Sequence, residues 1–196
     1  RRTPPQMTHP PSLGLLLLTG GQGRRLGGPK HPRPHPCGGS WGGHLVQVFE
    51  TVMTGGPIQI LGEPLPDRPE LSSVSDEGQG GAEALIRWAG RPAAQARRWW
   101  VVACDQVRWN PDHLRGWLDL AERHDPASSS WVVAHSGDLL QPLGGFLADR
   151  LREPMAGLRQ TRMTDLVRNL PHLVLKWESP VWNDVDTPED LSRWEG

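Results

Sequence analysis

Continuous apolar runs are the clearest hydrophobic pattern in the chain. The run Leu13–Leu18 contains only leucine and glycine and is followed by Thr19-Gly20-Gly21. Such a run, closed by glycines, is typical of a strand that is buried on both faces, as in a parallel sheet. Residues 99–104 form a second run of this kind, and Ile58–Leu61 form a shorter one. The chain is therefore predicted to contain several buried, parallel strands.

Helices are predicted between these strands. The best-marked helix covers residues 110–124, because Asn110 can cap it, Pro111 suits its first position, and Asp112 places an acid in its first turn. The other predicted elements are helices at 44–53, 82–89 and 164–169 and strands at 131–135 and 139–146.

The order of these elements predicts the domain organisation. A last helix is expected to begin at Thr187, with Asp190 as the acid three residues further on. Strands and helices alternate along residues 13–196, which indicates one α/β domain whose ligands bind at the carboxyl ends of its strands. Residues 1–12 are rich in proline and polar residues and are expected to form a flexible N-terminal arm.

Composition excludes several classes of protein. The 196 residues include 21 Lys and Arg against 22 Asp and Glu, and the formal charge of −1 gives no general attraction to nucleic acid. No apolar stretch approaches the roughly 20 residues that a membrane helix needs. The two cysteines, Cys37 and Cys104, are too few for a disulfide scaffold and favour a reduced, cytoplasmic protein. Neither nucleic acid nor a membrane is expected as a partner.

A glycine-rich loop with basic residues follows the first predicted strand. Residues 19–30 read Thr-Gly-Gly-Gln-Gly-Arg-Arg-Leu-Gly-Gly-Pro-Lys. The five glycines let backbone N–H groups surround an anion, and Arg24, Arg25 and Lys30 supply charge that phosphates can pair with. The loop is neither a Walker motif, which needs a glycine before the lysine, nor a dinucleotide fingerprint, whose third glycine is replaced here by leucine. It is predicted to hold a triphosphate.

An aspartate follows the second buried strand. Asp105 is therefore expected at the carboxyl edge of the sheet, where a carboxylate can hold Mg²⁺ against phosphate oxygens. Alternatively, Asp105 is an ordinary acidic residue of a loop without a ligand. The glycine-rich loop at residues 19–30, which we call the phosphate loop, favours the role in metal binding.

Three stretches of the sequence resemble one enzyme family. Residues 16–30 resemble the signature L-A-x-G-x-G-x-R-M-G-x-x-K of nucleotidyltransferases that activate sugars and cofactors, and within them the molybdenum cofactor guanylyltransferase (MobA-like) group. Residues 99–106, which end in Cys-Asp-Gln, and residues 182–191, which contain Asp-Thr-Pro-Glu-Asp, are similar to two further motifs of that group. The resemblance implies a single three-layer α/β/α domain of the Rossmann-like, GT-A-like nucleotidyltransferase type, with a mostly parallel central sheet.

The resemblance also implies roles for individual residues. Asp105 and Asp186 would hold Mg²⁺, with Asp184 as a competing second ligand, and Arg25, Lys30 and Asp105 would act in catalysis. Several of the glycines, and the aspartate at position 76, also fit ordinary turns. The residues implied to bind the nucleotide are Thr19, Gly20, Gly21, Gly23, Arg25, Lys30, Gly62, Asp76, Gly80 and Asp105.

The chain departs from the family pattern in places. Thr19 stands where alanine is usual, and residues 31–43 are rich in proline, histidine and glycine where the family has an apolar segment. This segment is predicted to be a loose loop, and its histidines and Cys37 lack the spacing of a zinc site. Trp182 is expected to fill core space, with stacking on a pterin or a base as the alternative.

The implied reaction is Mg²⁺-dependent transfer of GMP from GTP to the molybdenum-molybdopterin cofactor, with release of pyrophosphate. The base stays open between guanine and cytosine, because residues 104–106 and 184–188 also resemble the cytidylyl branch. A sugar-phosphate or alcohol-phosphate acceptor, or a nucleotide-binding relative without activity, are further alternatives. The implied partners are GTP or CTP, a molybdopterin-type cofactor, and a molybdoenzyme apoprotein or other proteins of cofactor biosynthesis.

Overall fold

The computed structural model describes the chain except residues 1–11, 22, 76, 78, 93 and 196. The predicted N-terminal arm, apart from Ser12, and the predicted nucleotide ligand Asp76 therefore lie outside the described residues.

The described residues form a seven-stranded sheet with strand order β3-β2-β1-β4-β6-β5-β7. Every neighbouring pair is parallel except those that involve β6, which runs antiparallel to both β4 and β5. The strands are β1 (Leu13–Leu18), β2 (Ile58–Leu61), β3 (Ser73–Val74), β4 (Arg98–Ala103), β5 (Trp131–Ser136), β6 (Leu139–Ala148) and β7 (His172–Lys176).

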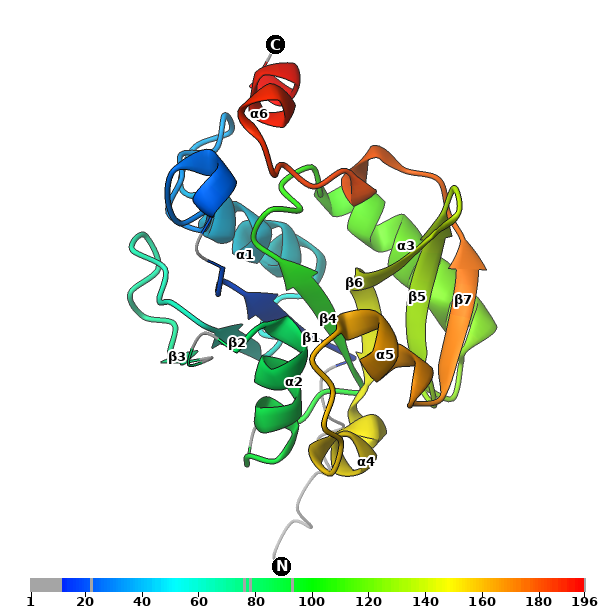
Figure 1. Cartoon of the computed structure of the whole chain (residues 1–196). Coiled ribbons are helices and arrows are strands. Elements are labelled where there is room, and N and C mark those ends of the chain that lie inside the picture. The colour runs from blue at the N-terminus through cyan, green and yellow to red at the C-terminus, as the bar shows by residue number, and fades with distance from the viewer. Residues whose placement is uncertain (1–11, 22, 76, 78, 93, 196) are drawn as a thin grey trace, which may run out of the picture.

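Helices cover both faces of this sheet (Figure 1). The α-helices are α1 (Trp41–Val52), α2 (Gly81–Ala89), α3 (Pro111–His124), α4 (Arg152–Ala156), α5 (Met163–Arg168) and α6 (Pro188–Glu195). Short 3₁₀ turns are η1 (Arg24–Leu26), η2 (Asp149–Leu151) and η3 (Pro180–Trp182). No helix in the described part of the chain is long and apolar enough to cross a membrane.

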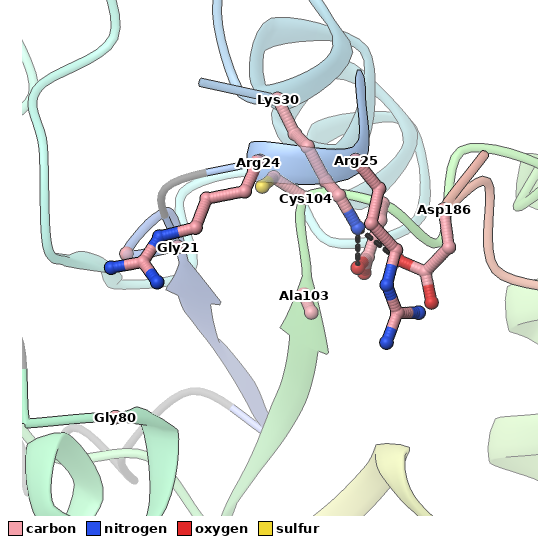
Figure 2. A pocket seen from close by; sticks show the side chains of 11 residues that line it. Gly21, Arg24, Arg25, Lys30, Gly80, Ala103, Cys104 and Asp186 are labelled. Atoms are coloured by element: carbon pink, nitrogen blue, oxygen red, sulfur yellow. Dashed lines mark hydrogen bonds and ion pairs between the residues drawn. The ribbon is translucent and has the colours of Figure 1, made fainter. Parts of the chain in front are cut away.

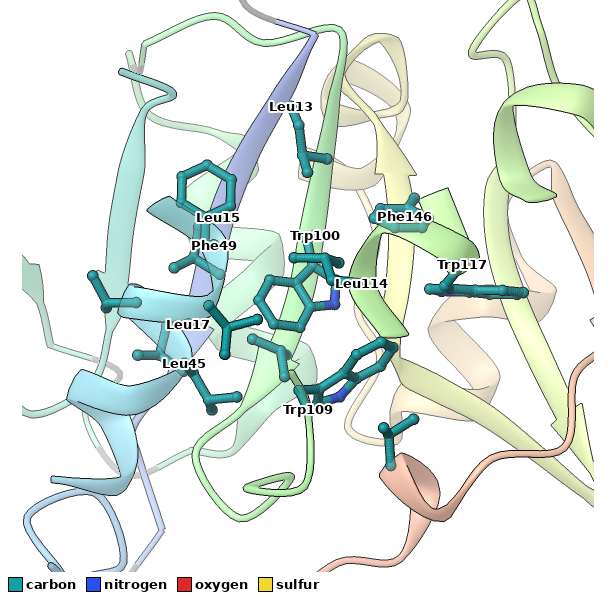
Figure 3. Packing of buried hydrophobic residues seen from close by; sticks show 14 of the residues in the cluster. Leu13, Leu15, Leu17, Leu45, Phe49, Trp100, Trp109, Leu114, Trp117 and Phe146 are labelled. Carbon is teal, nitrogen blue, oxygen red and sulfur yellow. The ribbon is translucent and has the colours of Figure 1, made fainter. Parts of the chain in front are cut away.

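The alternation of side chains along β1 explains the three layers. Leu15 and Leu17 point to one face, where they join a core that includes Phe49 of α1 and Trp117 of α3 (Figure 3). Leu16 points to the opposite face, into a second core formed with residues of α2, α4 and α5. Because successive side chains of a strand alternate between faces, a wholly apolar strand needs a cover on both sides. The single three-layer α/β/α domain with a mostly parallel sheet is thus confirmed.

Most predicted elements are present, but α1 begins earlier than expected. The helix was predicted from residue 44 and begins at Trp41, because the side chain of Ser40 accepts a hydrogen bond from Gly43 N at 2.9 Å. Asp67 in turn accepts from Ser40 N and Ser40 Oγ, each at 2.7 Å. A Cβ at Gly42 or Gly43 would overlap Leu65 or Asp67, respectively. Glycine is unfavourable inside a helix, so Gly42 and Gly43 weaken the prediction of a helix here. Because they lack a Cβ, they allow this close contact.

The segment at residues 31–43 is partly buried and held by hydrogen bonds, so the prediction of a loose loop is wrong. The N–H of Trp41 donates to Arg33 O at 2.8 Å, and that of His35 donates to Gly39 O at 2.9 Å. The rings of His35 and His44 are stacked, with centroids 3.6 Å apart and an interplanar angle of 8°. His35 Nε2 also lies 3.2 Å from Val107 O, a contact with a residue distant in sequence that no local pattern reports.

Trp182 is buried in an aromatic cluster at the end of η3. Its ring lies 5.3 Å from that of Trp109 and 5.5 Å from that of Trp177, centroid to centroid, and its indole N–H donates to Trp177 O at 2.8 Å. Only 4% of the residue is exposed. The expectation that it fills core space is therefore confirmed, and the stacking alternative is wrong because neighbouring rings enclose it.

Candidate active site

A cavity of about 510 Å³ lies at the carboxyl ends of the adjacent parallel strands β1 and β4 (Figure 2). This is the edge at which α/β sheets bind their ligands. The loop after β1, the residues after β4, the start of α2 and the segment before α6 all contribute to its wall. It is lined by Gly20, Gly21, Gly23, Arg24, Arg25, Lys30, Gly80, Ala103, Cys104, Asp105 and Asp186.

The glycine-rich loop folds back on itself at Gly23. This residue has a φ of 54°, and a Cβ there would overlap the carbonyl oxygen of Gly28. Hydrogen bonds from Leu26 N and Gly28 N to Gly23 O, at 2.9 and 3.2 Å, close the turn. Figure 2 shows the side chains of Arg24 and Arg25 extending to opposite sides of the cavity. The tight turn therefore places two guanidinium groups around a space lined by glycine.

Lys30 joins the two predicted metal ligands. Its ammonium Nζ lies 2.8 Å from Asp105 Oδ2 and also donates to Asp186 Oδ1 (Figure 2). Burial lowers the pKa of Lys30, but the charges and hydrogen bonds of Asp105 and Asp186 outweigh it and raise the pKa above its usual value. Lys30 is thus held as a cation between two carboxylates.

Asp186 is positioned by the start of α6 and by the loop after β4. The carboxylate of Asp190 accepts from Thr187 Oγ1 at 2.8 Å, from Thr187 N at 3.0 Å and from Asp186 N at 3.3 Å, as the capping pattern predicts. Val185 N donates to Asp105 O at 3.2 Å. These bonds bring together two aspartates that are far apart in the sequence.

Asp184, the competing candidate, faces a different environment. It does not line the cavity, whereas Asp186 does. Although Asp184 as a residue is exposed, the protein around its carboxyl group reduces hydration. This desolvation, together with the negative charges of Asp105 and Asp186, raises the pKa of Asp184 to about 7. The structure thus brings Asp186 to Lys30 and leaves Asp184 beside the pair.

Two predicted nucleotide ligands shape the cavity without lining it. Thr19 is buried, and its hydroxyl donates to Glu63 O at 2.6 Å. Gly62 has a φ of 120°, and a Cβ there would overlap Gly20 N and lie 2.9 Å from Thr19 Oγ1. Together they hold the end of β2 against the start of the phosphate loop. Gly80, at the start of α2, does line the cavity.

Cys104 and Gln106 flank Asp105 and were assigned no role in binding. Burial raises the pKa of the Cys104 thiol well above its usual range, so this cysteine stays neutral. Gln106 is buried and its side-chain amide donates to Leu143 O at 3.3 Å, which anchors the loop after β4 to β6. The sequence offered one signal for this role of Gln106, namely its position directly after the predicted ligand Asp105 in a stretch of buried residues.

The carboxylates fit a divalent cation that the substrate helps to bind. Asp105 and Asp186 already share one cation, the Lys30 ammonium. Within the described residues no group of three or more His, Cys, Asp and Glu side chains could hold a metal. Mg²⁺ usually takes one or two carboxylates and completes its shell with water and substrate phosphates. The donor set matches that preference.

Comparison with known proteins now identifies the family. The sequence matches the family described as "MobA-like NTP transferase domain" over residues 15–174. The chain belongs to this family. It is therefore a nucleotidyltransferase of the MobA-like type. No curated protein matches it significantly in sequence.

Several solved structures share the fold. Rv0371c from Mycobacterium tuberculosis superposes with a TM-score of 0.68 at 20% identity, covering 93% of this chain and 97% of that one. Molybdopterin-guanine dinucleotide biosynthesis protein A from Archaeoglobus fulgidus superposes with a TM-score of 0.66 at 16% identity, covering 92% of this chain and 95% of that one. The structure of 2-C-methyl-D-erythritol 4-phosphate cytidylyltransferase from Thermus thermophilus superposes with a TM-score of 0.61 at 14% identity. The match covers 91% of this chain and 95% of that one. A second Rv0371c structure, at 18% identity and a TM-score of 0.64, is a complex with manganese.

Proposed function

We propose that this chain transfers GMP from GTP to a molybdopterin-type cofactor, with release of pyrophosphate. The observation that carries the proposal is the Lys30 ammonium shared by Asp105 and Asp186 beside a glycine-lined, arginine-flanked loop. Family membership supports nucleotidyl transfer, and the likeness to the Archaeoglobus protein supports the choice of acceptor.

The phosphate loop supplies most of the binding. Backbone N–H groups of Gly20, Gly21 and Gly23 would hold the β- and γ-phosphates, and the Arg25 guanidinium would pair with phosphate oxygens. Lys30 would move its charge toward the phosphates as nucleotide binds. A phosphate oxygen of the acceptor attacks the α-phosphorus, the bond between the α- and β-phosphates breaks, and pyrophosphate leaves with the electron pair. Positioning and charge neutralisation are what such a transfer requires of a protein.

Asp105 and Asp186 would hold Mg²⁺ through their carboxylate oxygens. Bound there, the ion would supply positive charge that offsets the charge developing on the phosphates. The manganese complex of the related Rv0371c fold supports a divalent cation of this kind. Free cysteines at positions 37 and 104 support a reducing, cytoplasmic location for the reaction.

A CTP-dependent transfer is the second candidate. The likeness to the Thermus cytidylyltransferase fold and the Asp-Val-Asp-Thr-Pro segment at residues 184–188 favour it. The acceptor would again be a molybdopterin-type cofactor, or else another alcohol phosphate. In either case a molybdoenzyme apoprotein is a candidate recipient of the finished product.

Pyrophosphate release tests the proposal directly. The chain is incubated with Mg²⁺, with molybdopterin cofactor, and with GTP, CTP or ATP in turn. Release with GTP alone supports the guanylyl assignment, and release with CTP alone moves the enzyme to the cytidylyl branch. Asp105→Ala should abolish release, with Asp119→Ala on the surface of α3 as the matched control. Nucleotide binding without any release would identify a relative that binds but does not react.

A further inference from the structure

A small apolar core lies at the carboxyl edge of the sheet, separate from the two cores that cover its faces. Its buried members come from the start of α1, from the loop after β4 and from the segment before α6, and η1 and α6 add partly buried members. We call this set of six residues the third core. It consists of Leu26, Trp41, Val107, Val185, Leu191 and Trp194.

Three members of the third core are close in sequence to residues that line the cavity. Leu26 directly follows Arg25 of the phosphate loop. Val107 lies two residues after Asp105. Val185 directly precedes the second predicted metal ligand, and its N–H donates to Asp105 O at 3.2 Å. The third core therefore joins the chain segments that carry the phosphate loop and both carboxylates.

Helix α6 is attached to the third core by its two large apolar side chains. Leu191 and Trp194 are three residues apart and so lie on one face of the helix. The ring centroid of Trp194 lies 5.0 Å from that of His35 and 5.7 Å from that of Trp41, which it meets edge to face. Aromatic pairs with this spacing contribute more than their buried area alone. Figure 1 shows α6 apart from the helices that cover the two faces of the sheet, so the third core is its support.

The backbone of Asp186 is fixed by the start of α6. The carboxylate of Asp190 accepts hydrogen bonds from Asp186 N at 3.3 Å and from Thr187 N at 3.0 Å. Leu191 N donates to Thr187 O at 3.0 Å, which ties these bonds to the first turn of the helix. The side chain of Asp186 is itself 42% exposed, so the protein encloses it only in part. Its place in the site therefore depends on where α6 docks.

We propose that Trp194 is a positioning residue for Asp186, because it docks α6 on the third core and so holds this carboxylate where Mg²⁺ would bind. The inference rests on the proposed function, since it concerns a ligand of the proposed metal. Trp194 is not among the described residues that line the cavity, so it acts through α6. Asp105 is attached to the sheet through β4, and the effect of Trp194 should therefore fall on Asp186.

A double-mutant cycle tests the link between Trp194 and Asp186. Electron paramagnetic resonance of free Mn²⁺ gives the affinity of the full chain for the metal, without nucleotide, in the wild type, Trp194→Ala, Asp186→Asn and the double variant. We expect Trp194→Ala to weaken Mn²⁺ binding about tenfold in the otherwise native chain, as loss of a residue that orients a ligand does. In the Asp186→Asn chain the same change should cost less than about twofold. An equal loss in both backgrounds overturns the proposal.

Three further variants separate positioning from general stability. Trp194→Phe keeps an aromatic ring against the third core and should bind Mn²⁺ within about twofold of the wild type. Met155→Ala removes a fully buried side chain of α4 from the second core of the sheet and is the control for loss of stability. Its Mn²⁺ affinity should be unchanged. If Trp194→Ala fails to fold, Leu191→Ala is the smaller truncation on the same face of α6. Equal Mn²⁺ affinities of the wild type and the α6 variant, or an equal loss in Met155→Ala, overturn the proposal.

Pyrophosphate release provides a second measurement. In Trp194→Ala the Mg²⁺ concentration for half-maximal turnover should rise about tenfold, while kcat at saturating Mg²⁺ stays within about twofold of the wild type. A fall in kcat without a shift in the Mg²⁺ dependence overturns the assignment. If the wild type binds Mn²⁺ but releases no pyrophosphate with any nucleotide, the proposed function fails, and the double-mutant cycle still decides the role of Trp194. If the wild type binds no Mn²⁺, the inference is overturned even where pyrophosphate is released.

Discussion

The ammonium of Lys30 lies 2.8 Å from the carboxylate of Asp105 and at the same time donates to Asp186. A lysine of the phosphate loop thus rests between the two carboxylates that a divalent cation would use. A divalent cation held by these two carboxylates would repel the ammonium that now pairs with them. Binding of metal and movement of Lys30 toward the nucleotide are therefore expected to occur together.

Replacing Lys30 by methionine tests this competition. Lys30→Met leaves the carboxylates of Asp105 and Asp186 without their cation, so we expect Mn²⁺ to bind about tenfold more tightly in the absence of nucleotide, a change of about 1.4 kcal/mol. Turnover should fall by about 10²-fold or more, because charge on the phosphates is no longer offset. Electron paramagnetic resonance of free Mn²⁺ measures the first effect and pyrophosphate release the second.

The chain offers a matched control for this variant. Its only other lysine, Lys176, is exposed at the end of the edge strand β7. Lys176→Met should leave both Mn²⁺ affinity and turnover unchanged. Weaker Mn²⁺ binding by Lys30→Met than by Lys176→Met would contradict the idea that the ammonium competes with the metal.

Variants of Gly23 and Gly27 can distinguish the effect of backbone strain from the effect of steric overlap. Gly23 and Gly27 both have positive φ, 54° and 76°, but a Cβ at Gly23 would overlap Gly28 O, whereas one at Gly27 has no neighbour within 4 Å. Alanine in this conformation costs about 1–2 kcal/mol at either position. We expect Gly23→Ala to lose additional affinity for nucleotide, beyond any loss in Gly27→Ala. Calorimetric titration with GTP measures this, and equal affinities of the two variants would show that the turn at Gly23 does not shape the site.

The sequence predicts this site better than it predicts the edges of the sheet. Buried parallel strands are continuous apolar runs, so β1 and β4 and the positions that follow them were identifiable. The edge strands β3 and β7 were missed, because β3 has two residues and β7 alternates half-buried with exposed residues. The pairing of Lys30 with both aspartates could not be predicted, since it depends on where three distant segments meet in space.

Contacts across the chain likewise fix the start of α1. Burial raises the pKa of Asp67, but hydrogen bonds from Ser40 outweigh it and lower the pKa below its ordinary value. A carboxyl group with a lowered pKa stabilises the fold above its unfolded pKa, and this contribution disappears as the pH falls through the folded pKa. We expect Asp67→Asn to lower the free energy of unfolding by about 1 kcal/mol at pH 7.

Urea unfolding at pH 7 and pH 3 checks the role of Asp67. The difference between wild type and Asp67→Asn should shrink at pH 3, where the wild-type carboxylate is being protonated. Asp112→Asn is a suitable control, because Asp112 is an exposed acid in the first turn of α3. A difference that is the same at both pH values would show that the Asp67 charge does not hold Ser40.

The stacked imidazoles of His35 and His44 predict a loss of stability in mild acid. Both Nε2 atoms lie within hydrogen-bond distance of carbonyl oxygens, of Val107 at 3.2 Å and of Trp109 at 2.9 Å. Burial lowers the pKa of each histidine, and for His35 the neighbouring His44 lowers it further. Because the unfolded state then binds more protons, stability is complete above about pH 6.5 and falls as the pH drops through the folded pKa values.

His44→Gln should reduce this pH dependence. One proton taken up on unfolding changes the free energy of unfolding by up to about 1.4 kcal/mol per pH unit, so the slope between pH 6.5 and pH 5 should decrease by a measurable part of that amount. His31, whose pKa burial also lowers, keeps part of the slope in the variant. His124→Gln, at the exposed end of α3, is the control and should leave the slope unchanged. Equal slopes for wild type and His44→Gln, measured by urea unfolding across this range, would mean that the stacked pair does not titrate on unfolding.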